Sequence, residues 1–199
     1  MTTNYSESTV EMLSEHGINV KNVHCMNSKW QLWYHNPSSN EWGKSSYERI
    51  LHPIETFEEL FIIFANWSKL LPQVHEGMFF MMREGIIPMW EDKQNRNGGY
   101  WTFVVKKQES YELWRKLCVL CANEMIYNDH HQKWHMITGV SISPKRDFCI
   151  AKLWNGLLTN DQIINVNRLN TLLPELEFKS PPPRYVSHIE NIKKDMKKS

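Results

Sequence analysis

Short runs in which apolar and polar residues alternate predict a chain built largely from β-strands. Residues 29–35 are rich in aromatic side chains and end at a turn over 36–40, so this run is predicted to be a strand. The same reasoning predicts further strands at 46–54, 77–82, 100–106, 136–143, 148–155 and 176–179, with a hairpin turn at 144–147. The sequence shows no internal repeat, no glycine-rich dinucleotide motif and no phosphate-binding loop.

A helical period predicts a first helix that runs from Phe57 to about Trp67. Thr56 and Glu59 have the spacing of a capping box, which marks where this helix begins. Its inward stripe consists of Leu60, Ile63, Phe64 and Trp67. Phe57 and Phe61, four residues apart, add a second apolar face, so the helix is either buried on two sides or offers a docking face.

Two further helices are expected. Ser110 is predicted to cap the second, whose core stripe consists of Trp114, Leu117, Cys118, Cys121 and Met125. Cys118 and Cys121 have a spacing found in redox and zinc sites, but no second pair accompanies them, so buried structural thiols are the preferred interpretation. Thr159 and Gln162 form another capping box and open the third helix.

Composition narrows the class of protein. The 199 residues suit one domain, and 23 basic against 22 acidic residues give a net charge of +1, too little to coat long nucleic acid by charge alone. No apolar run approaches the roughly 20 residues of a membrane span. The four cysteines are too few and too scattered for a disulfide framework, which agrees with a reducing compartment. We therefore expect a cytoplasmic, monomeric protein that does not associate with membranes.

The chain divides into two parts by its patterning. Residues 1–28 are polar and lack a sustained period, so a loosely ordered N-terminal arm is expected. Residues 29–199 are expected to form one α+β domain, and they end in a lysine-rich tail that begins at Lys193.

The strongest candidate for chemistry is the loop between the strands predicted at 77–82 and 100–106. Pro88 stiffens the entry to this loop, so the indole of Trp90 is presented in a fixed place. Glu91 and Asp92 follow directly. An indole beside a carboxylate offers a guanine-like ring both a stacking surface and an acceptor for its N–H groups.

Other segments carry candidate residues. Trp42 lies among turn and charged residues, so its indole is expected at the surface. Lys152 and Trp154 share a strand face, because strand side chains alternate, and the turn before them is basic. Three histidines, His130, His131 and His135, could serve a metal, but a solvated loop is favoured because no carboxylate follows at a ligand spacing. We expect no metal and no cofactor.

Taken together, the segments resemble the eukaryotic translation initiation factor 4E family, which binds the mRNA 5′ cap. The similarity extends from about His24 to His188. It depends most on the block from Gly85 to Asp92, with Gly98, Gly99 and Trp101 after it. Supporting segments are 30–34, Trp42, 56–61 and 150–154.

The resemblance implies a fold and a site. The fold is a curved antiparallel sheet of about seven to eight strands, backed by three helices on its convex face. In the concave face, Trp42 and Trp90 would stack on 7-methylguanine, Glu91 would accept from its N–H edge, and Trp154 would contact the N7 methyl group. Lys145, Arg146 and Lys152 would bind the phosphates, although Ser143 stands where the family usually has arginine.

On the convex face, the resemblance implies a site for a factor 4G-like scaffold or an inhibitory binding protein. His24, Phe57, Phe61 and Trp114 are assigned to it. Phe61 replaces the usual tryptophan, and Arg115-Lys116 replaces the usual Leu-Glu pair, so partner recognition is expected to differ.

The expected function is cap binding in translation initiation, without catalysis. Alternatives are a cap-binding translational repressor, a tryptophan platform for a carbohydrate or another small ring, and an enzyme that uses the cysteine pair or the histidine cluster.

Overall fold

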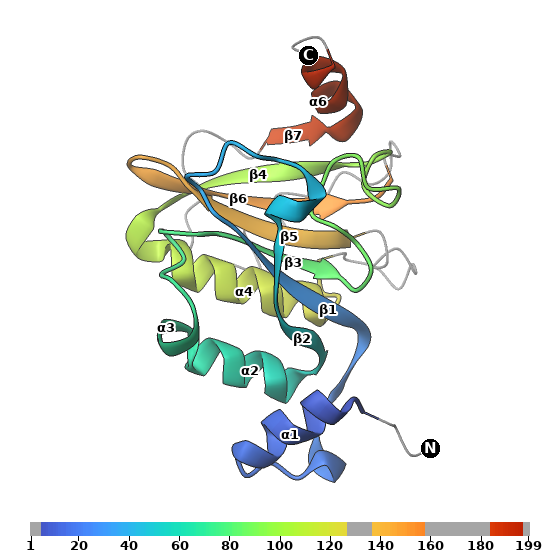
Figure 1. Ribbon diagram of the computed structural model, residues 1–199, viewed down its shortest axis with the longest axis vertical. Coiled ribbons are helices and arrows are strands. Elements are labelled where there is room, and N and C mark those ends of the chain that lie inside the picture. The colour runs from blue at the N-terminus through green and yellow to red at the C-terminus, as the bar shows by residue number, and fades with distance from the viewer. Residues whose placement is uncertain (1–4, 127–136, 158–183, 197–199) are drawn as a thin grey trace.

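The computed structural model describes residues 5–126, 137–157 and 184–196. Within this part of the chain, seven strands form one antiparallel sheet with the order β2-β1-β3-β5-β6-β4-β7 (Figure 1). The strands are β1 (Cys25–His35), β2 (Glu48–Thr56), β3 (Met78–Arg83), β4 (Gly99–Lys106), β5 (Ile137–Pro144), β6 (Phe148–Asn155) and β7 (Arg184–Ser187). The helices are α1 (Glu7–Glu15), α2 (Phe57–Ala65), α3 (Trp67–Leu70), α4 (Ser110–Ala122) and α6 (His188–Asp195).

The strands predicted before residue 156 are confirmed, with ends shifted by a few residues. β1 begins four residues earlier than the predicted 29–35, and the hairpin of β5 and β6 has the predicted turn. The helix predicted to begin at Thr159, the strand at 176–179 and the histidine cluster lie outside the described residues. No helix in the described part of the chain is both long and apolar enough to cross a membrane.

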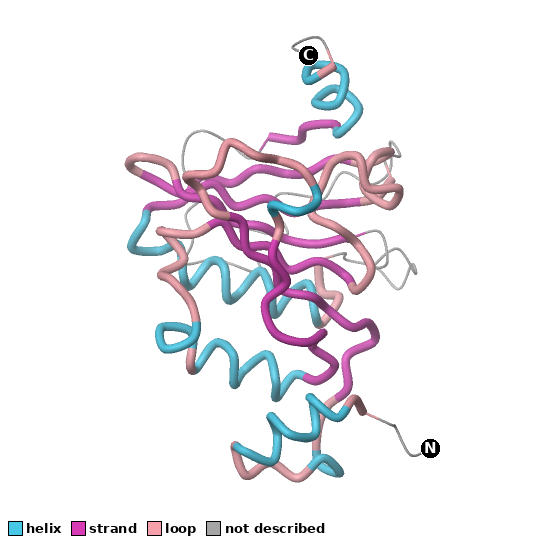
Figure 2. The backbone as a smooth tube through the Cα atoms, in the orientation of Figure 1, coloured by secondary structure: helices cyan, strands magenta, loops and turns pink. Residues whose placement is uncertain are grey.

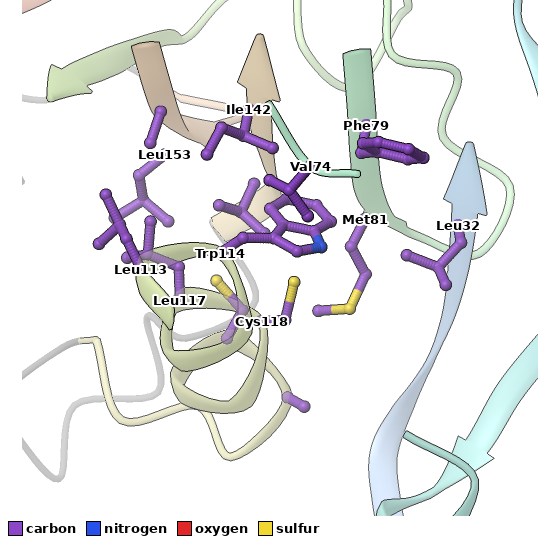
Figure 3. Close-up of a cluster of buried hydrophobic side chains, with 14 of the residues drawn as sticks. Leu32, Val74, Phe79, Met81, Leu113, Trp114, Leu117, Cys118, Ile142 and Leu153 are labelled. Atoms are coloured by element: carbon purple, nitrogen blue, oxygen red, sulfur yellow. The ribbon is translucent and has the colours of Figure 1, made fainter. Parts of the chain in front are cut away.

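Alternation along the strands divides their side chains between two faces of the sheet. On one face, side chains such as Leu32, Phe79 and Leu153 form the main core. α2 and α4 cover this face (Figures 1 and 2). Figure 3 shows Trp114 and its neighbours from α4 packed against these strand residues.

α2 begins at the predicted capping box. Thr56 Oγ1 accepts from the backbone N–H of Glu59 at 3.2 Å, and the Glu59 carboxylate accepts from the backbone N–H of Thr56 at 2.9 Å. The helix does not run unbroken to Trp67 as predicted. It ends at Ala65, because Asn66 leaves the helical conformation and bonds back to the Ile62 carbonyl through its side-chain amide.

α4 carries the predicted core stripe, since Trp114, Leu117, Cys118 and Cys121 are all buried. Met125 does not belong to it. The helix ends at Ala122, and Glu124 then adopts a left-handed φ of 58°, which turns Met125 toward solvent. Ser110 is not the N-cap either. Glu109 holds that position, and the Ser110 hydroxyl donates to the Lys107 carbonyl at 2.6 Å.

The expectation of a loosely ordered N-terminal arm is wrong from Tyr5 onward. Ser6 caps α1 by accepting from the backbone N–H of Thr9. Leu13 is completely buried, and Met12 packs against the main core. The sequence does not reveal this helix because it has only nine residues, and the two apolar side chains that anchor it, Met12 and Leu13, are too few to show a sustained period.

Candidate functional site

The second face of the sheet carries a separate cluster of large side chains, which we call the aromatic face. Its buried members are Trp33, Phe80, Met82, Ile86, Tyr100 and Trp154. Tyr47 and Trp90 pack against it from two loops, residues 36–47 and 84–98. The aromatic face and these two loops carry five of the site residues predicted from the sequence: Trp42, Trp90, Glu91, Lys152 and Trp154.

The loop that carries Trp90 is held rigidly by its own polar side chains. The Asp92 carboxylate accepts from the backbone N–H of Ile87 at 3.2 Å and from that of Gln94 at 2.8 Å. The fully buried Asn95 amide donates to the carbonyls of Ile87 and Met89. Asp92 is therefore a structural residue of the loop, and the backbone from which the Trp90 indole projects is held in place.

Glu91 points its carboxylate to the exterior, next to the other loop. Burial raises the pKa of Tyr47 to about 12, and the negative charge of Glu91 contributes to this rise. Such a contribution requires the two side chains to be near one another. Glu91 forms no ion pair with any described residue, so its oxygens are available to a ligand.

Trp42 is 54% exposed, as the sequence predicts for a surface indole. One face of its ring stacks on His35, with 4.4 Å between the ring centroids and 12° between the planes. His35 also contacts Tyr47. Trp42 is thus tied to the aromatic face through His35 and Tyr47, and more than half of the residue remains open to solvent.

Trp154 lies in the floor of the aromatic face and is only 2% exposed. Its Nε1–H donates to the Ser141 hydroxyl at 2.9 Å, and its ring packs against Tyr100 and His188. The indole can therefore offer a ligand only a small part of its edge.

Lys152 lies on the same face as Trp154, as predicted, and its Nζ is 4.4 Å from the centre of the Tyr100 ring. Burial, with a smaller contribution from the nearby Lys145 cation, lowers the pKa of Lys152 to about 8. Lys145 and Arg146 are both exposed at the hairpin turn. The structure thus places Lys145 near Lys152, but no described contact connects Arg146 with either lysine.

Four aromatic or histidine side chains of this region were missed by sequence reasoning: His35, Tyr47, Tyr100 and His188. Alternation could have found Tyr100, because it lies opposite Trp154 in the β4–β6 register. The others come from distant segments, and only the fold brings them to the aromatic face.

His188, the first residue of α6, is completely buried against Tyr100 and Trp154. Asn191, one turn later, donates to the Tyr100 hydroxyl at 3.1 Å. These two contacts attach α6 to the edge of the aromatic face, which is also where Lys152 lies.

The burial of His188 predicts a pH-dependent stability. Burial lowers the pKa of His188 to about 3, with a contribution from the Lys152 cation. As the pH drops below about 6.5, the unfolded chain takes up this proton and the folded protein does not. The free energy of unfolding therefore decreases as the pH decreases, by about 1.4 kcal/mol between pH 7.5 and 5.5. In urea unfolding at pH 7.5 and 5.5, His188→Phe is expected to lack this loss, whereas the exposed-site control His16→Ala keeps it. Equal losses in both variants would contradict the prediction.

The convex-face residues do not all fit their predicted role. His24 bonds to Glu58 through its ring, with Nδ1 2.7 Å from Oε1, and Phe61 is 50% exposed on α2. Phe57 is partly buried. Trp114 is fully buried in the main core, so its assignment as a partner contact is wrong. Its place in the core stripe of α4 already accounts for an apolar side chain there.

The thiols of Cys118 and Cys121 lie in the main core beneath α4. Burial raises the pKa of both, to about 12 for Cys121, so neither is a thiolate at neutral pH. This agrees with the interpretation as structural thiols.

Comparison with known proteins identifies the family. The model for "Eukaryotic initiation factor 4E" matches residues 25–199, so the chain belongs to the eukaryotic initiation factor 4E family. The chain is 31% identical over 152 residues to eukaryotic translation initiation factor 4E of Saccharomyces cerevisiae, covering 72% of this chain and 67% of that protein. It is 29% identical over 152 residues to the same factor of Candida glabrata, covering 72% of this chain and 68% of that protein.

Solved structures share the fold. Caenorhabditis elegans eIF4E-3, in complex with the 4E-binding protein Mextli and a cap analog, aligns with a TM-score of 0.69 at 22% identity, covering 86% of this chain and 96% of that one. Ascaris suum eIF4E-3 in complex with the m2,2,7G cap aligns with a TM-score of 0.65 at 24% identity, covering 83% of this chain and 92% of that one.

Proposed function

We propose that this protein binds the 7-methylguanosine 5′ cap of mRNA in the cytoplasm, without catalysis, and acts in translation initiation. The observation that carries the proposal is that two loops bring tryptophans to one face of the sheet. Trp90 packs against the aromatic face, Trp42 is tied to it through His35 and Tyr47, and the exposed Glu91 carboxylate lies near Tyr47. Membership of the 4E family supports it, as do the similar structures that were solved in complex with a cap analog or the m2,2,7G cap.

In the proposed complex, the Trp42 and Trp90 rings lie on either side of the base. Methylation at N7 gives the base a positive charge, which adds a cation–π attraction to the stacking. The same charge makes the N1–H and N2–H₂ groups stronger donors to the Glu91 carboxylate. Because unmethylated guanine lacks both gains, the site selects the methylated base. The small part of Trp154 that is accessible borders the N7 methyl group.

The phosphates extend toward the basic hairpin. Lys152 and Lys145 bind them as point charges, and Arg146 adds an exposed guanidinium at the turn. An anion at this place also relieves the repulsion between the two lysines that lowers the pKa of Lys152.

The proposal is tested by titrating the protein with 7-methyl-GTP, GTP and a neutral sugar while tryptophan fluorescence is followed. We expect strong quenching and tight binding with 7-methyl-GTP only. Binding of the sugar, or equal affinity for GTP and 7-methyl-GTP, would favour the tryptophan-platform alternative.

The lowered pKa of Lys152 predicts a pH-dependent affinity. In the free protein Lys152 loses its proton near pH 8, and a bound phosphate raises its pKa, so binding takes up a proton above pH 8. Between pH 8 and 9, the affinity for 7-methyl-GTP should fall about fivefold more in the wild type than in Lys152→Arg, which stays charged. Calorimetry in buffers of different ionisation enthalpy measures the proton uptake. Protonation changes of the nucleotide itself are the same for both proteins, so they cancel in the comparison. Identical pH profiles would remove Lys152 from the phosphate site.

A translational repressor remains the second candidate, because it would use the same pocket and differ only in partners. The convex face favours such a difference. Phe61 has no indole N–H, and Glu112 accepts from Arg115 at 2.8 Å and lies 3.4 Å from Lys116. The basic pair is thus held where the family usually has Leu-Glu.

Calorimetry with a standard Tyr-x-x-x-x-Leu-hydrophobic peptide tests this face. We expect the peptide to bind this protein about tenfold more weakly than it binds the S. cerevisiae relative, since one hydrogen-bond donor is missing and one charge is reversed. Phe61→Trp combined with Lys116→Glu should recover most of that loss. Wild-type affinity equal to that of the relative would show that partner recognition is unchanged.

A further inference from the structure

His35 lies in an unusual setting for a histidine. It is the last residue of β1, pairs with Met78 of β3, and is 0% exposed. Because strand side chains alternate, it lies on the same face as Trp33, which belongs to the aromatic face. A buried polar ring at the edge of a candidate ligand site requires a reason, since an apolar side chain would be buried at lower cost.

One ring nitrogen of His35 holds the loop that carries Trp42. Nε2 is 2.8 Å from the carbonyl oxygen of Glu41, the residue directly before Trp42. A carbonyl oxygen only accepts, so the proton is on Nε2 and the ring donates. This bond fixes the backbone at the base of the Trp42 side chain.

The ring itself fixes the indole. The imidazole lies nearly parallel to the Trp42 indole, with 12° between the planes. The Tyr47 ring contacts the imidazole with 5.0 Å between the ring centroids and 56° between the planes. Tyr47 in turn packs edge-on against Phe80 of the sheet. A continuous series of ring contacts, the first of them stacked, thus connects the exposed indole to the sheet.

We propose that His35 is a positioning residue for the cap base: it holds Trp42 in its stacking orientation before the ligand arrives. The inference rests on the proposed function, because it takes Trp42 as one of the two indoles that enclose the base. A half-exposed tryptophan on a loop without this support samples several rotamers. Only the fraction of molecules with the correct rotamer can bind, so the apparent affinity falls by that fraction.

The first test uses the free protein and does not depend on the cap. In protein labelled with 5-fluorotryptophan, the ¹⁹F resonance of Trp42 is assigned with Trp42→Phe. In His35→Ala, this resonance is expected to move toward that of free fluorotryptophan, while the other eight tryptophans keep their shifts. A Trp42 resonance that does not move would overturn the proposal.

The second test separates positioning from general stability by stopped-flow binding of 7-methyl-GTP. His35→Ala should lower the association rate constant about tenfold and leave the dissociation rate constant nearly unchanged. His35→Phe keeps the stacked ring, and His35→Gln keeps an N–H donor for Glu41, so each should recover part of the loss. His16→Ala is the matched control and should bind like the wild type, because His16 is the exposed residue that directly follows α1.

The outcomes are distinct. An unchanged association rate in His35→Ala, or a change confined to the dissociation rate, would overturn the positioning role. If His35→Ala does not fold, the Phe and Gln variants decide the question in the same way. If the wild type does not bind 7-methyl-GTP at all, the proposed function fails, and the ¹⁹F experiment still decides whether His35 orients Trp42.

Discussion

Replacing Trp90 with alanine is expected to lower the affinity for 7-methyl-GTP by about 100-fold, and Trp42→Ala should have a similar effect. Stacking on an aromatic side chain contributes roughly 1–3 kcal/mol per base, and the cation–π attraction to a methylated base adds to it. A loss of about 2.7 kcal/mol corresponds to a factor of 100. Fluorescence or calorimetric titration of each variant measures the effect.

Phe61→Ala is the matched control for these variants. Phe61 is an aromatic residue about as exposed as Trp42, but it lies on α2, which covers the opposite face of the sheet. Its removal should leave cap affinity unchanged. Full affinity in Trp90→Ala, or an equal loss in Phe61→Ala, would contradict the assignment of the two indoles.

Glu91→Gln is expected to weaken 7-methyl-GTP binding about 30-fold and to erode the preference for guanine. The substitution keeps the shape of the side chain but replaces a charged acceptor by an amide whose N–H₂ group faces the donors of the base. Hydrogen bonds to charged groups contribute about 1.5–3 kcal/mol, which sets the size of the effect. The wild type should discriminate against 7-methyl-inosine triphosphate, which lacks the N2 amino group, and the variant should not.

Glu76→Gln provides the comparison for Glu91, because Glu76 is also an exposed carboxylate. Asp92→Asn is unsuitable, since Asp92 holds the backbone of its loop. If Glu91→Gln and Glu76→Gln bound both nucleotides alike, the edge of the base would have to be recognised elsewhere.

Much of the fold follows from local signals in the sequence. The capping box of Thr56 and Glu59 defines where α2 begins, and the alternation of β6 correctly places Lys152 on the face of Trp154. Such predictions succeed because hydrogen bonds within a turn, or the two-residue period of a strand, determine them.

The features that were missed depend on contacts between distant segments. α1 is stabilised by burial of Leu13 against the rest of the fold, a tertiary effect that its nine residues do not reveal. For Trp114 the resemblance implies a partner surface whereas the helical stripe predicts the core, and the stripe is correct, because a resemblance in sequence position does not report burial. The stack of His35 on Trp42 joins a strand end to a loop, and no sequence period marks it.

The central claim is that a methylated guanine lies between Trp42 and Trp90 with its edge on Glu91. A structure of the protein bound to 7-methyl-GTP tests it most directly. We predict that the base lies flat between the two indoles, that both Glu91 oxygens accept from its N–H edge, and that Trp42 keeps its stack on His35. A base bound elsewhere on the protein, or held by the aromatic face without contact to one of these indoles, would contradict the account.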